Sequence, residues 1–272
     1  MAGNHTSTTT TLEQTPAMNS LLMAKVDSVM TDDTSGPAKP IETTPTPIKT
    51  TSPAADANVR ILQLHEYKEA ALSLAYAFEH DEVSLYFLNT PDRAHWTKQQ
   101  KWDLHLKIME YITYAHLLKG LVLAAGPNYD CVALWMPPGK NIDDIPTILR
   151  SGLWRLNYQL SAEGRHRFFS EFFPLLHDTK AAVLEEKDPE SWYLVYIGTR
   201  PSGRGKGYAR KLVDYVTAKA DKEGRACYLE SSNEVNEAIY RKMGFEVSKR
   251  IYLQRAAEGT VRLEIMVREA RK

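Results

Sequence analysis

One segment in the second half of the chain constrains the fold most. Residues 192–197 form a continuous apolar run, which predicts a strand buried on both faces. A glycine-rich turn follows at 198–207, and residues 208–220 then predict a helix with Tyr208, Leu212, Val213 and Val216 on one side. A strand, a glycine turn and an amphipathic helix in this order predict an α/β protein, in which the helix covers one face of a sheet.

Hydrophobic spacing also predicts elements before this segment. They are a strand at 59–64, helices at 65–78 and 97–118, and two strands at 120–125 and 131–136 joined by a turn at 126–128. Thr97 is a candidate cap for the second helix. Residues 140–187 are rich in aromatic residues and leucine, but no single period places their elements.

The elements after the segment complete the pattern. They are a buried strand at 226–230, a helix at 234–243 that ends at Gly244, and two half-buried strands, of which the first carries Phe245, Val247, Ile251 and Leu253. In the last strand Val261, Leu263, Ile265 and Val267 alternate with Arg262, Glu264, Met266 and Arg268. The order of elements predicts a mixed sheet with helices on both faces.

Composition changes abruptly after residue 58. All the aromatic residues (5 Trp, 14 Tyr and 7 Phe) come later, whereas residues 1–58 hold 13 Thr and 6 of the 14 Pro. Such a segment cannot bury enough apolar surface to offset the entropy of ordering it. We predict a disordered Thr/Pro-rich N-terminal arm at 1–58, with at most a transient helix at 18–30, and one domain at 59–272.

Charge and cysteine usage exclude several classes of protein. The 34 Lys plus Arg balance 34 Asp plus Glu, so no overall field favours nucleic acid or an anionic membrane. Cys131 and Cys227 have no further Cys or His at a ligand spacing, which argues against a disulfide scaffold and a structural zinc site. No apolar run approaches the roughly 18 residues of a membrane span. We expect a cytoplasmic or also nuclear protein that uses no metal.

The glycine-rich turn indicates phosphate chemistry. A helix start offers unpaired backbone N–H groups, the glycines let a ligand approach the main chain, and Arg204 and Lys206 add positive charge. A P-loop is excluded because the turn lacks the Lys and the hydroxyl of GxxxxGK[ST]. A dinucleotide fold needs parallel half-sheets, for which too little chain follows residue 203. The alternative to a phosphate site is a tight structural turn whose basic residues are only solvated.

Two blocks of the sequence resemble the GNAT N-acetyltransferase superfamily. Residues 199–209 resemble its acetyl-CoA signature (R/Q)-x-x-G-x-(G/A), with Arg204, Gly207 and Ala209 at the defining positions. A strand, then Asn233, then Tyr240 and a closing Gly244-Phe245 resemble its second block. Within the superfamily, residues 135–139, 192–194 and 229–231 are most similar to the puromycin-acetyltransferase-like branch, which acts on small molecules.

This resemblance implies a fold and a co-substrate. The fold is an α/β arrangement with a central mixed, mostly antiparallel sheet, whose fourth and fifth strands splay apart, and with helices on both faces. Acetyl-CoA would lie in the gap as the co-substrate. Its expected contacts are Ile197, Gly198, Thr199, Arg204, Gly205, Lys206, Gly207, Tyr208, Ala209 and Asn233. For Asn233, capping of the helix that begins at Glu234 is a further role.

The resemblance also implies direct attack of a neutral amine on the thioester. That reaction needs a base, a donor to the carbonyl oxygen and an acid for the leaving thiolate. Tyr240 matches the general acid of the family, and packing under the sheet is its structural alternative. Glu230 is our candidate base, since a carboxylate that ends a buried strand can have a raised pKa. A structural hydrogen-bonding role is equally open for Glu230, and the backbone N–H near Ile197 would stabilise the oxyanion.

Three functions are therefore compared. The first is an acetyl-CoA-dependent N-acetyltransferase whose partner is a small-molecule amine, with no nucleic acid or membrane. The second is a protein or peptide N-acetyltransferase, and the third is a non-catalytic acyl-CoA-binding sensor. The sequence indicates neither the acceptor nor the oligomeric state.

Overall fold

The computed structural model describes residues 59–256 and 259–271, so the predicted arm at 1–58 and its helix at 18–30 lie outside the described residues. Seven strands form one sheet in the order β1-β2-β3-β4-β5-β7-β6. The strands are β1 (Arg60–Ile61), β2 (Leu121–Ala125), β3 (Cys131–Met136), β4 (Trp192–Thr199), β5 (Cys227–Ser231), β6 (Glu246–Leu253) and β7 (Val261–Arg268). Strands β4 and β5 pair in parallel and all other neighbours pair antiparallel, which confirms the predicted mixed, mostly antiparallel sheet.

Helices surround this sheet in the described part of the chain. The longer ones are α2 (Tyr67–Ala77), α3 (Glu82–Leu88), α4 (Lys98–Lys119), α5 (Ile145–Ser151), α8 (Phe173–Leu184), α9 (Tyr208–Glu223) and α10 (Glu234–Arg241). Single turns complete the set at η1 (Leu64–Glu66), η2 (Pro91–Arg93), η3 (Pro127–Tyr129), η4 (Leu153–Arg155), α6 (Leu156–Gln159), α7 (Ala162–Arg165), η6 (Glu185–Glu190) and η7 (Pro201–Gly203). A π-helical segment, η5 (His166–Phe172), lies between α7 and α8. No helix of the described residues is both long enough and apolar enough to cross a bilayer.

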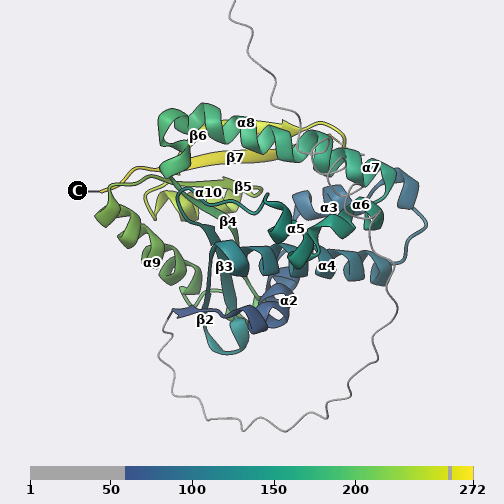
Figure 1. Ribbon diagram of the computed structural model, residues 1–272, viewed down its shortest axis with the longest axis horizontal. Coiled ribbons are helices and arrows are strands. Elements are labelled where there is room, and N and C mark those ends of the chain that lie inside the picture. The colour runs from purple at the N-terminus through teal and green to yellow at the C-terminus, as the bar shows by residue number, and fades with distance from the viewer. Residues whose placement is uncertain (1–58, 257–258, 272) are drawn as a thin grey trace, which may run out of the picture. The chain divides into compact units, whose positions relative to one another are not determined.

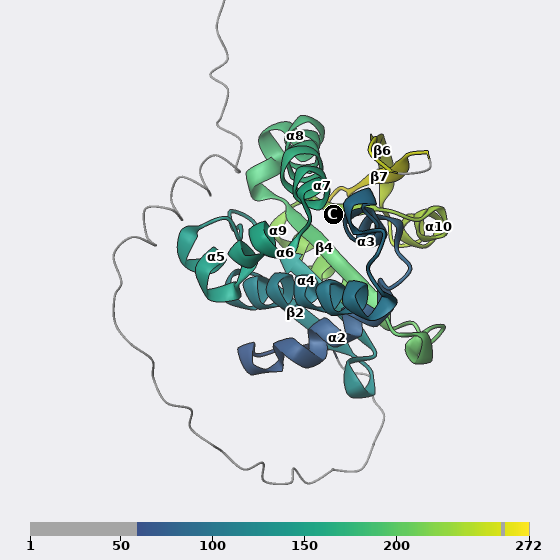
Figure 2. The same cartoon turned by 90° about the vertical axis from the view of Figure 1, so that its right-hand side faces the viewer.

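The two faces of the sheet carry separate cores. Along β2, Val122 and Ala124 belong to one core and Leu123 and Ala125 to the other, as the alternation of a strand requires. Helix α9 covers one face, which we call the α9 face (Figure 1). Helices α2 and α4 pack side by side on the other, which we call the α2 face (Figure 2). The predicted placement of helices on both faces is confirmed.

The local signals for the helices are clear in the structure. Thr97 caps α4, as predicted, and forms a capping box with Gln100. Helix α2 ends against the backbone of β4 at Gly198, where an added Cβ would lie 2.6 Å from the Cβ of Ala77. Glycine is therefore required at Gly198 for close packing of α2 on the sheet.

The prediction of a half-buried last strand is wrong. Strand β7 lies between β5 and β6, so both of its edges are paired, and side chains that point to either face of the sheet are buried along it. Glu264 and Arg268 are almost fully buried. Their charges are paired, since Arg268 forms a bidentate contact with Asp221 and Glu264 lies 3.1 Å from Arg262. The alternation of apolar and polar residues thus reflects buried ion pairs rather than a solvent-exposed face.

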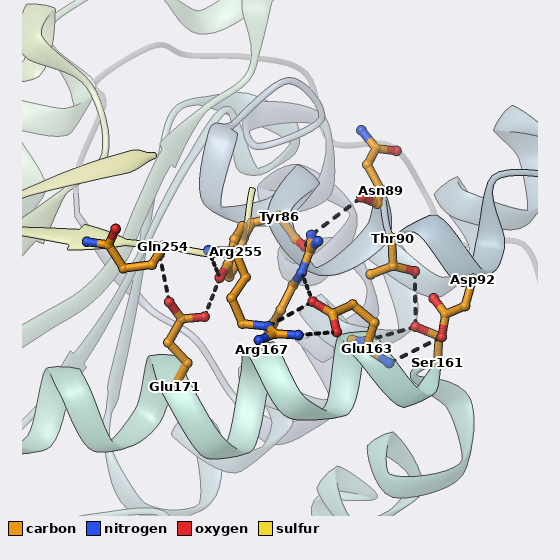
Figure 3. Close-up of polar contacts among 11 residues, drawn as sticks. Tyr86, Asn89, Thr90, Asp92, Ser161, Glu163, Arg167, Glu171, Gln254 and Arg255 are labelled. Atoms are coloured by element: carbon orange, nitrogen blue, oxygen red, sulfur yellow. Dashed lines mark hydrogen bonds and ion pairs between the residues drawn. The ribbon is translucent and has the colours of Figure 1, made fainter. Parts of the chain in front are cut away.

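Residues 140–187, which the sequence did not resolve, form α5 to α8 and the start of η6, and α8 runs above β7 in the view of Figure 1. A charged network ties this segment to α3 and to the end of β6 (Figure 3). Arg255 contacts Glu163 with two hydrogen bonds of 2.8 and 2.9 Å, and the buried Arg167 contacts Glu163 at 2.9 Å. Arg167 also donates to the backbone oxygen of Tyr86 at 2.7 Å. Hydrogen bonds from Arg255 and Arg167 lower the pKa of Glu163 to about 2.

We predict that Glu163→Gln lowers the free energy of unfolding by about 2–3 kcal/mol at pH 7, because it leaves Arg167 buried without a counter-charge. A lowered pKa means that the stabilisation is present above pH 4.5 and is lost as the pH falls toward 2. Urea unfolding at pH 7 and pH 3 measures both effects. In the control Asp214→Asn, which removes an exposed ion pair with Arg210, the free energy should change by less than about 0.5 kcal/mol.

Candidate active site

The site is organised by a gap in the sheet. Strands β4 and β5 pair only from Trp192 to Leu194 and from Cys227 to Leu229, although both strands continue beyond these residues. Residues 196–199 of β4 therefore pair with β3 on one side and have no β5 partner on the other. The predicted burial of 192–197 on both faces fails here, since residues 195–197 are half-exposed. Backbone amides that point into such a gap are available to a ligand.

Glu230 lies where the gap begins, on the α2 face. The hydroxyl of Tyr193 donates to Glu230 Oε2 at 2.7 Å. The other oxygen, Oε1, is buried near the hydroxyl of Tyr228, and neither atom forms a hydrogen bond of good geometry with a described residue. The rings of Tyr193 and Tyr228 pack edge to face with centroids 5.4 Å apart. Buried polar atoms without partners beside a gap fit a site where a ligand supplies the missing hydrogen bonds.

The electrostatics of this cluster single out Glu230. Burial raises the pKa of Glu230 to about 7, against the opposing effects of the Tyr193 hydrogen bond, the Tyr228 hydroxyl and the charge of Lys180. Burial also raises the pKa of Tyr193, Tyr196 and Tyr228, and the negative charge of Glu230 adds to each shift. The phenols therefore stay protonated near neutral pH, whereas the Glu230 carboxyl changes its charge there.

Tyr240 lies on the opposite side of the gap. Like Ile197, it packs against the core of the α9 face, and its ring centroid is 6.0 Å from that of Phe245. Burial raises the pKa of the Tyr240 phenol, so the hydroxyl is protonated and can donate. The structure thus brings the predicted acid and the predicted base to the same gap, one on each face.

The glycine-rich turn lies between the end of β4 and α9. Gly205 and Gly207 have φ of 76° and 74°, and a Cβ at either would meet no atom within 4 Å. Arg204 and Lys206 are exposed, and the α9 start, which has Gly207 in the cap position, receives no side-chain cap from the described residues. Free amide groups at a helix start, with two cations beside them, suit an anionic group.

The remaining predicted contact residues have mixed surroundings. Ile197 and Thr199 lie on the unpaired part of β4, and the Thr199 hydroxyl donates to Cys131 Sγ at 3.1 Å. Tyr208 and Ala209 begin α9 and are half-buried. The Asn233 side chain accepts a hydrogen bond from the amide of Val235 at 2.8 Å, so its expected capping role is confirmed. No group of three or more His, Cys, Asp or Glu suited to a metal occurs in the ranges that the structure describes.

Sequence reasoning missed Tyr193, Tyr196, Tyr228 and Lys180. A strand period of two places Tyr193 and Tyr196 on opposite faces, but both join the core on the α2 face. The cause is a β-bulge, because Leu194 pairs with Trp135 and the next pair joins Tyr196 to Leu134. Of these four residues, only Tyr228 could have been recognised from the sequence. It lies two residues before Glu230, and the period of a strand places both on the same face.

Comparison with known proteins agrees with this geometry. The sequence model of the acetyltransferase (GNAT) domain matches residues 177–247. An uncharacterized N-acetyltransferase of Schizosaccharomyces pombe (strain 972 / ATCC 24843) is 48% identical over 208 residues, which cover 76% of this chain and 81% of the relative. The chain belongs to the GNAT N-acetyltransferase superfamily and is an acetyltransferase.

Solved structures share the fold at low identity. Arylalkylamine N-acetyltransferase 2 from Aedes aegypti has a TM-score of 0.52 and 16% identity, over 80% of this chain and 100% of that chain. The Drosophila melanogaster polyamine N-acetyltransferase has a TM-score of 0.51 and 11% identity, over 79% of this chain and 100% of that chain. At these identities the likeness shows the fold alone.

The raised pKa of Glu230 has a consequence for stability. A carboxyl whose pKa rises on folding favours the folded state at low pH, and this contribution is lost as the pH rises from 4.5 to about 7. We predict that Glu230→Gln raises the free energy of unfolding by about 2–3 kcal/mol at pH 8 and has little effect at pH 4.5. Denaturant titrations at both pH values test this. Equal stability of wild type and variant at pH 8 would contradict the burial of a charged carboxyl, and the exposed Glu246→Gln serves as the control.

Proposed function

We propose that this enzyme transfers the acetyl group of acetyl-CoA to the amine of a small molecule. The observation that carries the proposal is the gap between β4 and β5, with Glu230 on one face and Tyr240 on the other. A base and an acid on opposite sides of one opening fit a reaction in which an amine and a thioester approach each other from the two faces.

The α9 face suits the coenzyme. The open glycine turn and the helix start behind it offer amide groups and the charges of Arg204 and Lys206 to a pyrophosphate. Gly205, Gly207, Tyr208 and Ala209 would contribute backbone groups there. Ile197, Gly198 and Thr199 would offer the backbone of β4 to the extended pantetheine arm, and Asn233 lies at the start of α10, across the gap.

The residues of this chain are proposed to move the protons that accompany one acyl transfer. Glu230 Oε1 takes a proton from the acceptor ammonium, and the neutral amine then forms the C–N bond at the thioester carbon. The backbone amide near Ile197 donates to the carbonyl oxygen as negative charge develops on it. The C–S bond breaks, and the hydroxyl of Tyr240 protonates the leaving thiolate. The nitrogen loses its second proton as it becomes the amide nitrogen, and this proton returns the Tyr240 phenolate to its hydroxyl form by way of solvent. Glu230 later releases its proton to solvent.

The function is tested by turnover with purified full-length protein. Acetyl-CoA at millimolar concentration should raise the melting temperature, because it binds the folded state. Release of free coenzyme thiol is then followed with 2-phenylethylamine, agmatine, spermidine and a lysine-containing peptide. Thiol release with the small amines supports the proposal. Release with the peptide alone indicates a protein acetyltransferase, and stabilisation without release from any acceptor indicates a sensor.

We predict that Tyr240→Phe lowers kcat by about 10–100-fold, because the variant keeps the ring and loses the proton donor. Binding of acetyl-CoA, measured by calorimetry, should stay within about threefold of wild type. Tyr215→Phe, which alters an exposed tyrosine of α9, is the matched control and should leave kcat unchanged. An unchanged rate in Tyr240→Phe would remove the acid role from Tyr240.

We further predict a pH profile governed by Glu230. Because the base must be ionised to accept a proton, log kcat/KM should fall on the acid side of about pH 7. Glu230→Gln should lose about 100-fold or more in kcat/KM and should no longer show this acid limb. A variant that retains wild-type activity and profile would show that Glu230 has only a structural role.

A further inference from the structure

We propose that Lys180, held in place by Asp188, is a positioning residue for Glu230, and that its charge keeps the Glu230 side chain ready to accept a proton. This role rests on the proposed function of Glu230 as the base. Lys180 lies in the segment 140–187, which the sequence did not resolve, and Asp188 directly follows it, so neither was a candidate before the structure.

The geometry places the Lys180 ammonium against the Glu230 cluster. Its Nζ atom lies 5.7 Å from the ring centroid of Tyr193 and 5.8 Å from that of Tyr228. These are the two tyrosines that flank Glu230, and Tyr193 donates to its carboxylate. The Lys180 side chain is only 18% exposed, so solvent screens its charge weakly. A cation between two ring faces is held by the rings themselves as well as by its counter-ion.

The partner of Lys180 comes from a sharp reversal of the chain. Helix α8 ends at Leu184, and Glu185 then adopts φ 51° and ψ −125°, a region that residues other than glycine rarely occupy. This reversal lets η6 return along α8, so that the Asp188 carboxylate pairs with Lys180 Nζ. Lys180 also donates to the backbone oxygen of Asp188 at 3.3 Å, and the Ser191 hydroxyl donates to the same oxygen at 2.9 Å. The pair is thus fixed by several contacts.

The groups that face Glu230 come from four elements. Tyr193 and Tyr196 belong to β4, Tyr228 to β5, Lys180 to α8 and Asp188 to η6. Asp81, in the loop between α2 and α3, acts on the cluster through Tyr196 and accepts a hydrogen bond from the Ser232 hydroxyl. Within the described ranges, Lys180 is the cation whose charge favours the Glu230 carboxylate.

The proposed role of the Lys180–Asp188 pair predicts an effect on Glu230 that a purely structural ion pair would not have. Removal of the Lys180 charge withdraws support from the carboxylate, so the pKa of Glu230 should rise. Removal of the Asp188 charge leaves Lys180 without a counter-charge near Glu230, so the pKa of Glu230 should fall. Loss of a merely structural contact would weaken the fold in both variants without moving the titration in opposite directions.

The titration is read directly by difference infrared spectroscopy of the full chain. The protonated-carboxyl band that Glu230→Gln abolishes identifies Glu230, and its pH dependence gives the midpoint without any acceptor. We expect Lys180→Met to move the midpoint up by about one pH unit, and Asp188→Asn to move it down by a similar amount. In Lys180→Arg, which keeps the charge, the midpoint should stay near the wild-type value. In the double variant, Lys180→Met combined with Asp188→Asn, the midpoint should return toward the wild-type value.

Turnover separates this role from the function on which it rests. With 2-phenylethylamine as the acceptor, the acid limb of kcat/KM should follow the infrared midpoints in all variants. Suppose that Glu230→Gln loses activity, while the Glu230 carboxyl titrates in Lys180→Met and in Asp188→Asn as it does in wild type. The role of Lys180 is then overturned, and the assignment of Glu230 as the base stands. If Glu230→Gln is fully active, the base assignment fails, and opposite infrared shifts would then show only that Lys180 and Asp188 set the charge of a non-catalytic carboxyl.

Discussion

Strands β4 and β5 share only three residue pairs, and beyond Leu194 and Leu229 they continue without each other. A sheet that is continuous elsewhere thereby acquires an opening between two parallel strands, with a different core on each face. The opening leaves backbone groups of β4 unpaired, and it places the end of β5, with Glu230, at its border. The candidate site exists because the backbone pairing between β4 and β5 stops there.

The walls of this opening are rigid for identifiable reasons. On the α2 face, Gly198 lets α2 pack directly on β4, and Tyr193 fixes one oxygen of Glu230. Beyond the opening, β7 is held by buried ion pairs, and the network around Glu163 ties the end of β6 to α3 and η5 (Figure 3). Rigid surroundings keep a desolvated carboxyl in one geometry, and desolvation is the main cause of its raised pKa.

Charge at the site depends on contacts between segments that are distant along the chain. Glu230 belongs to β5 and Tyr193 to β4, whereas Lys180 and Asp188 belong to the segment between β3 and β4. Their joint effect places the titration of one carboxyl near neutral pH, where a base for an amine is most useful. The glycine turn precedes α9 on the other face, where its open backbone and the exposed Arg204 and Lys206 suit an anionic group.

The sequence by itself determined most of the local elements and the position of the glycine turn between a strand and a helix. Hydrophobic period, the Thr97 cap and the glycines are signals between near neighbours, and short-range sterics and hydrogen bonds decide them. Tyr240 became a candidate through motif spacing, and Glu230 through its position at the end of a buried strand. Only the tertiary structure decided the burial of β7, the bulge that brings Tyr193 and Tyr196 to one face, and the approach of Lys180 to Glu230. These depend on strand order and on packing between distant segments, which no local pattern encodes.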